Sequence, residues 1–312
     1  MQYQSNMTEF ILVAFSLNYD LDVILFHVFF LAYVVIIFGN LAIITVTCYD
    51  SRLHLPMYFF LGNISLLELS ISSVVIPKLL AILLPFKKTI TFVGCFVQCY
   101  FYFALGTADF MLLAVMSYDR YLAICNPLHY VNIMNWNTCL CLACFSWTGG
   151  FLIDLVPGFI KATMPFCKGN TINHFFCDSL PIMKLSCMDT TFLQLLDFFL
   201  FSFIILGSLF ITIWTYMMIA ITIFKIPTVS GRTKAFSTCI SHLILVCLGY
   251  GGTIFLYIIP KGNYYMSYNK LVSIVTIFIT PVLSPFIFCL RNNVVQVALE
   301  DMYVRLKKSV LE

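Results

Sequence analysis

Charged residues are scarce in this sequence. Asp, Glu, Lys and Arg make up only 10% of its 312 residues, whereas 61% are hydrophobic. A soluble domain of this length needs more charged and polar side chains to cover its surface. The composition therefore excludes a soluble globular protein and predicts a chain that lies within a lipid bilayer.

Basic runs and a cleavable leader are also missing. The net charge is only +3, and no cluster of Lys and Arg is long enough to follow a nucleic-acid backbone, so nucleic acid is excluded as a partner. Lys307 and Lys308 are better suited to anionic lipid headgroups. The first 20 residues lack the cationic segment and the cleavage site of a signal peptide, so the first membrane span is expected to target the chain.

Seven apolar segments are long enough to cross about 30 Å of hydrocarbon as helices. We therefore predict an all-α membrane protein, a seven-transmembrane helix bundle. It comprises a tail at 1–22, a membrane domain at 23–290 and a cytoplasmic segment at 291–312. The predicted spans are 23–47, 57–84, 92–122, 138–160, 192–224, 235–259 and 268–290.

Lysine and arginine divide almost evenly between the two sides, so they do not fix the orientation. Cysteines are more informative. Four of them, Cys95, Cys167, Cys177 and Cys187, can pair in three ways, and only an extracellular or luminal side lets them oxidise. Asn6 begins a glycosylation sequon, Asn-Met-Thr, on that same side. The N-terminus is therefore predicted to be extracellular, with Asn6 a candidate for glycosylation.

The segment after Leu290 predicts a short amphipathic helix on the inner membrane surface. Its charged residues lie away from a set of apolar residues that recur at helical spacing. That set is Val294, Val297, Ala298, Met302 and Leu306.

Two acids, Glu68 and Asp109, lie deep within predicted spans, where an ionisable side chain is costly and is a functional candidate. One interpretation is a pair of neutral acids that neighbouring hydroxyls satisfy. The other is a shared cation or proton site whose occupancy differs between two packings of the bundle. The sequence leaves both interpretations open.

Asp119 and Arg120 stand at the cytoplasmic end of the third span. Arg120 follows Asp109 by eleven residues, so the two share one face of a helix. An arginine in this place can pair with the neighbouring carboxylate or with a partner from the cytosol. We interpret the pair as an exchangeable latch, and two interfacial surface charges are the plainer alternative.

The residues around this pair carry a family resemblance. The stretches "LHLPMYFFLGNISLLE" (53–68), "MSYDRYLAICNPLHY" (116–130), "KAFSTCISHL" (234–243) and "PVLSPFIFCLRN" (281–292) closely resemble motifs of the vertebrate olfactory (odorant) receptors. These are rhodopsin-like (class A) G-protein-coupled receptors. The "MSYDRY" variant and the "FFCDSLPIMKLSC" loop are similar to the class II, tetrapod-type branch.

The resemblance implies an odorant receptor in the plasma membrane, expected in the cilia of olfactory sensory neurons. It would activate a stimulatory olfactory-type G protein and raise cyclic AMP, without cofactor or catalysis. His174 falls where some members are suspected to bind copper or zinc. One histidine beside oxidised cysteines is a poor metal site, so no metal is predicted. The implied disulfides are Cys95–Cys177 and Cys167–Cys187, and the implied switch residues are Asp119, Arg120, Tyr121, Ser284, Pro285 and Phe288.

This chain departs from the family pattern at several positions. The family usually has Asp at Glu68 and Glu at Asp109, an exchange of chain lengths that a shared site tolerates. Ser284 replaces an Asn, and Phe288 replaces a Tyr whose hydroxyl reaches inward on activation. Gly249 replaces a Phe and makes a more flexible hinge. The resemblance therefore predicts coupling that is weak, leaky or altered.

The inward faces of the spans predict a ligand cavity above Asp109. It is apolar with a few hydroxyls, and Asp197 is the only other buried acid or base expected on the outer side. Such a lining favours small, mostly uncharged molecules. The predicted lining is Tyr102, Phe103, Gly106, Thr107, Tyr250, Thr253, Ile254, Tyr257, Ile274 and Ile277.

Two other classes of membrane protein fit the sequence less well. A transporter or channel would show inverted repeats or several charges midway through the membrane, and only Glu68 and Asp109 qualify. An intramembrane enzyme would need a nucleophile with its base or a histidine-rich metal set. His27 and His242 are far from acids in the sequence, and no protease motif is present.

Overall fold

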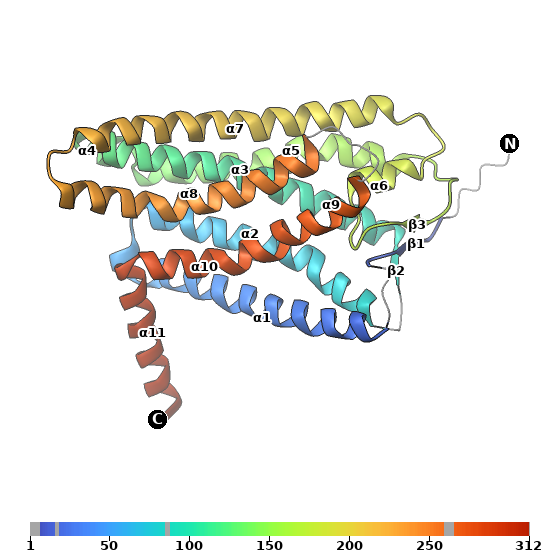
Figure 1. The fold of residues 1–312 in the computed structure, drawn as a ribbon, viewed down its shortest axis with the longest axis horizontal. Coiled ribbons are helices and arrows are strands. Elements are labelled where there is room, and N and C mark those ends of the chain that lie inside the picture. The colour runs from blue at the N-terminus through green and yellow to red at the C-terminus, as the bar shows by residue number, and fades with distance from the viewer. Residues whose placement is uncertain (1–6, 16–18, 85–87, 259–264, 312) are drawn as a thin grey trace.

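Long helices run side by side along the longest axis of the molecule (Figure 1). The computed structural model describes residues 7–15, 19–84, 88–258 and 265–311. Six helical segments of this part are long and apolar enough to cross a membrane, and α8 adds the shorter apolar stretch His242–Tyr257. The predicted seven-helix membrane bundle is confirmed. The spanning helices are α1 (Tyr19–Tyr49), α2 (Pro56–Leu83), α3 (Phe92–Cys125), α5 (Trp136–Thr163), α7 (Thr191–Lys225), α8 (Val229–Tyr257) and the pair α9 (Tyr265–Ile274) with α10 (Thr280–Arg291).

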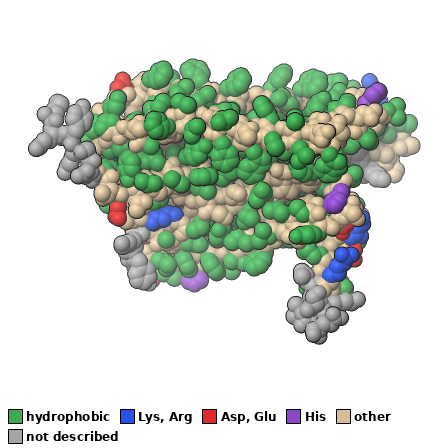
Figure 2. Space-filling view, turned by 180° about the vertical axis from the view of Figure 1, so that it is seen from behind, with side chains coloured by type: hydrophobic (Ala, Val, Ile, Leu, Met, Phe, Trp, Pro, Cys, Tyr) green, Lys and Arg blue, Asp and Glu red, His purple; other side chains and the backbone are tan. Residues whose placement is uncertain are grey.

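The outer surface of the bundle is apolar, as a lipid solvent requires. Figure 2 shows hydrophobic side chains covering the middle of the face in view, with charged side chains near its two ends. Phe203 on α7 is 81% exposed and Phe38 on α1 is 69% exposed. Large apolar side chains at such exposure would be a liability in water, and they mark a multi-pass membrane protein.

Helix α3 lies at the centre of the bundle. In the most apolar stretch of α3, 67% of the residues are buried inside the bundle, against 11% in that of α1. It packs against α2, α5, α7 and α8. Gly150 of α5 permits one of these approaches, because a Cβ at that position would lie 2.4 Å from the carbonyl oxygen of Ala104. The helix that carries the predicted polar stripe is therefore shielded from lipid along most of its length.

The last span is interrupted by a π-helical turn, η2 (Val275–Ile279), between α9 and α10. The sequence predicts one uninterrupted span at 268–290. Pro281 follows this turn and has no N–H to donate, so the backbone changes its hydrogen bonding there. The carbonyl oxygen of Ile277 instead accepts a bond from Ser72 Oγ at 3.4 Å.

A three-stranded sheet covers the end of the bundle at which α3 begins. The N-terminal strand β1 (Glu9–Leu12) is central, in the order β2–β1–β3. It pairs antiparallel with β2 (Thr89–Thr91) and parallel with β3 (Thr171–Ile172). Segments far apart in the chain thus join in one covering layer, seen at the right of Figure 1.

Part of the expected tail at 1–22 belongs to this layer. Phe10 is fully buried and stacks on Phe92 at 5.8 Å between ring centroids. Four residues of strand are too few for a periodicity signal, so the sequence gives no indication of β1. Asn6, the predicted glycosylation site, lies outside the described residues.

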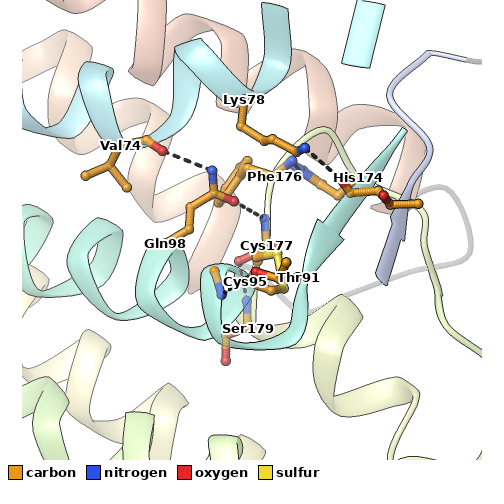
Figure 3. Close-up of a disulfide and its surroundings, with 12 residues drawn as sticks. Val74, Lys78, Thr91, Cys95, Gln98, His174, Phe176, Cys177 and Ser179 are labelled. Carbon is orange, nitrogen blue, oxygen red and sulfur yellow. Dashed lines mark hydrogen bonds between the residues drawn. A yellow bond between two sulfur atoms is a disulfide. The ribbon is translucent and has the colours of Figure 1, made fainter. Parts of the chain in front are cut away.

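Two disulfides fasten the long second outer loop. Cys95 at the start of α3 pairs with Cys177, and Cys167 pairs with Cys187. These are the pairs that the resemblance implies. Gln98 reinforces the first of them, because its Oε1 accepts from the Cys177 N–H at 2.9 Å and its Nε2 donates to Val74 O (Figure 3). The loop also contains the short helix α6 (Ser179–Lys184).

His174 is buried within this loop, with 1% of its surface exposed. Its Nδ1 accepts from the Phe176 N–H at 3.4 Å, and its ring lies 4.7 Å from that of Phe175. Burial and then the nearby charge of Lys270 lower the pKa of His174 to about 3. The neutral imidazole therefore fills an aromatic cluster. No group of three or more His, Cys, Asp or Glu side chains in the described residues could hold a metal.

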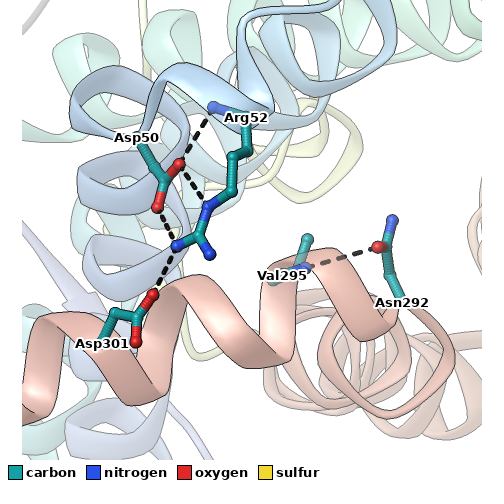
Figure 4. A network of polar contacts seen from close by, with 5 residues as sticks. All are labelled: Asp50, Arg52, Asn292, Val295 and Asp301. Carbon is teal, nitrogen blue, oxygen red and sulfur yellow. Dashed lines mark hydrogen bonds and ion pairs between the residues drawn. The ribbon is translucent and has the colours of Figure 1, made fainter.

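The amphipathic helix predicted after Leu290 is present as α11 (Asn293–Leu311), which leaves the bundle at its other end (Figure 1). Arg52 lies in the short 3₁₀ turn η1 (Ser51–Leu53) and ties α11 to the first inner loop. Its Nη2 donates to Asp50 Oδ2 at 2.6 Å and to Asp301 Oδ2 at 2.7 Å (Figure 4). The bonds from Arg52 lower the pKa of Asp50 to about 2, so this carboxylate stays ionised.

Candidate functional site

A cavity of about 100 Å³ lies between α2, α3, α7, α8 and the last span, and we name it the inner cavity. Seven of the ten residues predicted to line it do so. These are Tyr102, Phe103, Gly106 and Thr107 of α3, Thr253 and Tyr257 of α8, and Ile277 of η2.

Three predicted lining residues do not reach the inner cavity. Tyr250, Ile254 and Ile274 are absent from its walls. On α8 the residues that face it are Gly249, Thr253 and Tyr257, spaced by four, so the face is turned from the predicted stripe. Tyr250 instead packs on Phe110 at 5.0 Å between ring centroids. Ile274 lies just before the π-helical turn and Ile277 lies within it. The wider spacing of the turn therefore places these two residues on different faces.

Sequence reasoning missed the contribution of α7. Phe201, Ile204 and Ile205 line the inner cavity, but α7 is apolar on all sides and its periodicity is weak. The few polar residues of α7 could have indicated its inward face, because Asp197, Ser208 and Thr212 are all buried. Their spacing of 11 and 4 residues marks one face. The other unpredicted lining residues are Glu68, Ile71, Asp109, Phe110, Gly249, Thr276, Thr280 and Pro281.

Glu68 and Asp109 lie together at the inner cavity, as a shared site requires. Glu68 Oε2 and Asp109 Oδ1 are buried, and neither has a hydrogen-bond partner among the described residues. The same holds for the hydroxyls of Ser65 and Ser284. Carboxylate and hydroxyl oxygens are the ligands that hard cations prefer, so these groups fit either a small cation or shared protons.

A second buried polar cluster lies nearer the extracellular end and corrects an expectation. Asp197 is not alone there, because Asp154 and Lys161 of α5 are also buried. Lys161 Nζ lies 2.7 Å from Asp197 Oδ2, and Thr107 Oγ1 donates to Asp154 Oδ2 at 2.9 Å. Lys161 was overlooked because α5 continues to Thr163, beyond the apolar segment that predicted it. A paired charge can remain buried at this depth.

Asp119 and Arg120, the predicted latch, form a buried ion pair at the cytoplasmic end of α3. Arg120 donates to Asp119 Oδ2 through Nη2, and through Nε at 3.1 Å. Tyr130, in the short helix α4 (Pro127–Ile133), donates its hydroxyl proton to Asp119 Oδ1 at 2.8 Å. Burial and the Asp119 charge raise the pKa of Tyr130. Asp119 is fully buried and Arg120 is 7% exposed, so the two are not interfacial surface charges.

The other expected switch residues lie on α3 and α10. Tyr121 packs on Trp214 at 5.4 Å between ring centroids. Ser284, Pro285 and Phe288 of α10 are buried. Pro285 also explains the glycine at position 39, because a Cβ there would lie 2.9 Å from Pro285 Cγ. Helices α1 and α10 are therefore tightly packed at Pro285, one of the expected switch residues.

Comparisons with known proteins show which family this chain is similar to. A family model described as "Olfactory receptor" matches residues 29–306. The chain is 47% identical over 301 residues to Olfactory receptor 6J1 of Homo sapiens, covering 96% of this chain and 87% of that protein. It is 44% identical over 309 residues to Olfactory receptor 6E1 of Mus musculus, covering 99% of each.

Proposed function

Because the chain belongs to the olfactory receptor family, we propose that it binds small, volatile, mostly uncharged odorants in the inner cavity and activates a stimulatory olfactory-type G protein, raising cyclic AMP. Odorant sensing and G-protein coupling in general follow from the family, whose members are receptors and not enzymes. We further expect the receptor in the plasma membrane of olfactory cilia.

The single observation that supports this ligand class is the character of the inner cavity. Its walls are mostly aromatic and aliphatic, and their polar groups are the hydroxyls of four threonines and the acids Glu68 and Asp109. A dry apolar cavity of about 150 Å³ binds benzene, so about 100 Å³ suits a molecule of similar size after slight widening. Such a ligand buries little area, and affinities near micromolar, about −8 kcal/mol, are expected.

The proposal is tested by screening volatile compounds on cells that express this chain with an olfactory-type G protein. We expect a subset of small neutral volatiles to raise cyclic AMP above that of cells without the receptor. If only charged or large compounds act, or none acts while the receptor is at the surface, the proposal is wrong.

Filling the inner cavity should abolish these responses. A Cβ at Gly106 meets no atom within 4 Å, and Gly106 lines the cavity, so Gly106→Leu is expected to fill part of the cavity. We expect loss of odorant-evoked cyclic AMP with surface expression retained. Gly207→Leu is the matched control, because Gly207 is also helical, also has open space around it, and faces outward. Equal responses in both variants would contradict the assignment of the cavity.

We also propose that Glu68 and Asp109 share a sodium ion in the resting receptor. A cation bound in one packing only shifts the equilibrium toward it, so replacing sodium with N-methylglucamine should lower the half-maximal odorant concentration about threefold. Asp109→Asn should remove this sodium effect, whereas Asp189→Asn, at an exposed outer position, should keep it. A sodium effect that survives in Asp109→Asn would leave the neutral-acid interpretation.

A further inference from the structure

A second, larger cavity lies outside the inner one, and we name it the outer chamber. Its volume is about 440 Å³, and it lies between helix α6, the first turns of α7 and the end of α8. Polar side chains are more frequent on its walls than in the inner cavity. They include Ser179, Thr191, Gln194 and Asp197.

Three aromatic residues, Phe103, Phe201 and Tyr257, line both cavities and so form the wall between them. Phe103 stacks on Phe201 at 4.9 Å between ring centroids and meets Tyr257 edge-on at 5.6 Å. Phe201 and Tyr257 are 5.9 Å apart. The three rings come from α3, α7 and α8, so a rotamer change of one ring opens the wall without moving a helix.

Phe103 is held more firmly than Phe201. The ammonium group of Lys161 lies 5.7 Å from the centroid of the Phe103 ring, and the same group is fixed by Asp197 at 2.7 Å. A cation over an aromatic face is attractive, more so when it is desolvated. Phe201, which has no such contact among the described interactions, is the ring more able to turn aside.

Beside the outer chamber, the three-stranded sheet covers part of the extracellular end formed by the described residues. Strand β1 sits between β2 and β3. Lys270 Nζ donates to the carbonyl oxygens of Val13 and Ala14, at 2.9 and 2.6 Å, and to Asn173 Oδ1 at 2.8 Å. These bonds hold the N-terminal segment across the bundle, and the Cys95–Cys177 disulfide holds the second outer loop to α3. Opening that route would require several of these bonds to break together.

We infer that odorants reach the inner cavity through the outer chamber, and that the rings of Phe103, Phe201 and Tyr257 are a gate that sets the rates of binding and release. This inference rests on the proposed function of the inner cavity. The gate acts on the same small, uncharged molecules, and its three rings exclude larger ones that enter the outer chamber.

The test blocks the outer chamber chemically. Gln194→Cys places a thiol on its wall, and a membrane-impermeant thiosulfonate reagent then attaches a bulky group there. Native outer cysteines will not interfere, because Cys95, Cys167, Cys177 and Cys187 are in disulfides and Cys99 is buried. Thr171→Cys, at an exposed residue of strand β3, is the matched control. Mass spectrometry confirms that each thiol is modified.

The probe is the volatile alcohol with the largest response in the screen described above, and the readout is the time course of its binding and washout. After modification of Gln194→Cys we expect both rates to fall about tenfold or more, with the dissociation constant changed less than about threefold, since a barrier affects both directions equally. Modified Thr171→Cys should behave like the parent. If Gln194→Cys fails to reach the surface, Leu180→Cys on the opposite wall serves instead.

Unchanged rates in the fully modified chamber variant would overturn the inference and indicate that the odorant enters between helices from the lipid. A large change in the dissociation constant with unchanged release would also overturn it, because it would make the chamber part of the binding site. Failure of the proposed function looks different, since no volatile would then act on the unmodified parent.

Discussion

Arg120→Ala is expected to abolish odorant-evoked cyclic AMP while leaving the receptor measurable at the cell surface. Arg120 pairs with Asp119 inside the closed bundle, and the proposed activation requires its guanidinium group to leave that partner for the G protein. Alanine has no group to make the new contact. Breaking a buried pair costs about 3 to 5 kcal/mol, although Tyr130 still donates to Asp119, so surface expression should fall only in part.

The measurement is a dose-response curve for cyclic AMP, normalised to surface receptor counted by antibody on intact cells. Arg232→Ala is the matched control, since Arg232 lies at the same cytoplasmic end, near the start of α8. It should keep at least about half of the response, as surface charge changes usually cost little. An unchanged dose-response curve for Arg120→Ala would contradict the latch mechanism.

Cys95→Ser is expected to prevent export of the receptor. The disulfide that it removes joins residues 82 apart in sequence and anchors the loop that covers the bundle. Loss of a native disulfide typically costs about 2 to 5 kcal/mol, which is a large part of the stability of most proteins. Gln98 would also lose its fixed partner at Cys177. Surface receptor should therefore drop severalfold or more, and the retained protein should be sensitive to protease.

Two variants make this result specific to the pair. Cys177→Ser should be as harmful as Cys95→Ser, and the double variant should be no worse than either, because all three remove one bond. Cys48→Ser is the control, as Cys48 is exposed and unpaired, and it should reach the surface normally. Normal surface levels for Cys95→Ser would show that the disulfide is dispensable.

The number and placement of the spans could be predicted because lipid imposes a length and a composition on each of them. The ends of the helices could not be predicted in this way. Helix α8 begins at Val229, whereas its apolar segment begins at 235, because polar residues such as Arg232 continue the helix outside hydrocarbon. Hydropathy detects only the buried part of a helix. The sheet around β1 could not be predicted either, since its pairing joins three short segments that are far apart in the sequence.

The site was predictable where polar residues interrupt an apolar helix. Asp109, Asp119 and Arg120 of α3 stood out for this reason, and all three lie inside the bundle. The walls from α7 could not be found in the same way, because Phe201 and Ile205 resemble the lipid-facing residues beside them. The predicted cavity-facing side of α8 differs from the observed side by about one residue. A mostly apolar sequence does not fix the rotation of a helix about its axis, so an error of this size goes undetected.

The departures from the family pattern lie at structurally sensitive places. Gly249 lines the inner cavity, where the family's Phe would occupy part of its volume. Ser284 is buried, and its hydroxyl has no partner among the described residues. Phe288 is also buried and lacks the hydroxyl of a Tyr. Altered coupling stays a prediction.

The central claim is that a small guest in the inner cavity releases Arg120 from Asp119 and so activates a G protein. Its most direct test is GDP release from a purified olfactory-type G protein mixed with this receptor in lipid nanodiscs, with and without the most active volatile. Release should accelerate at least about tenfold with the parent receptor, a shift of about 1.4 kcal/mol in the barrier, and not with Arg120→Ala. Equal release rates with and without a volatile that demonstrably occupies the cavity would contradict the account.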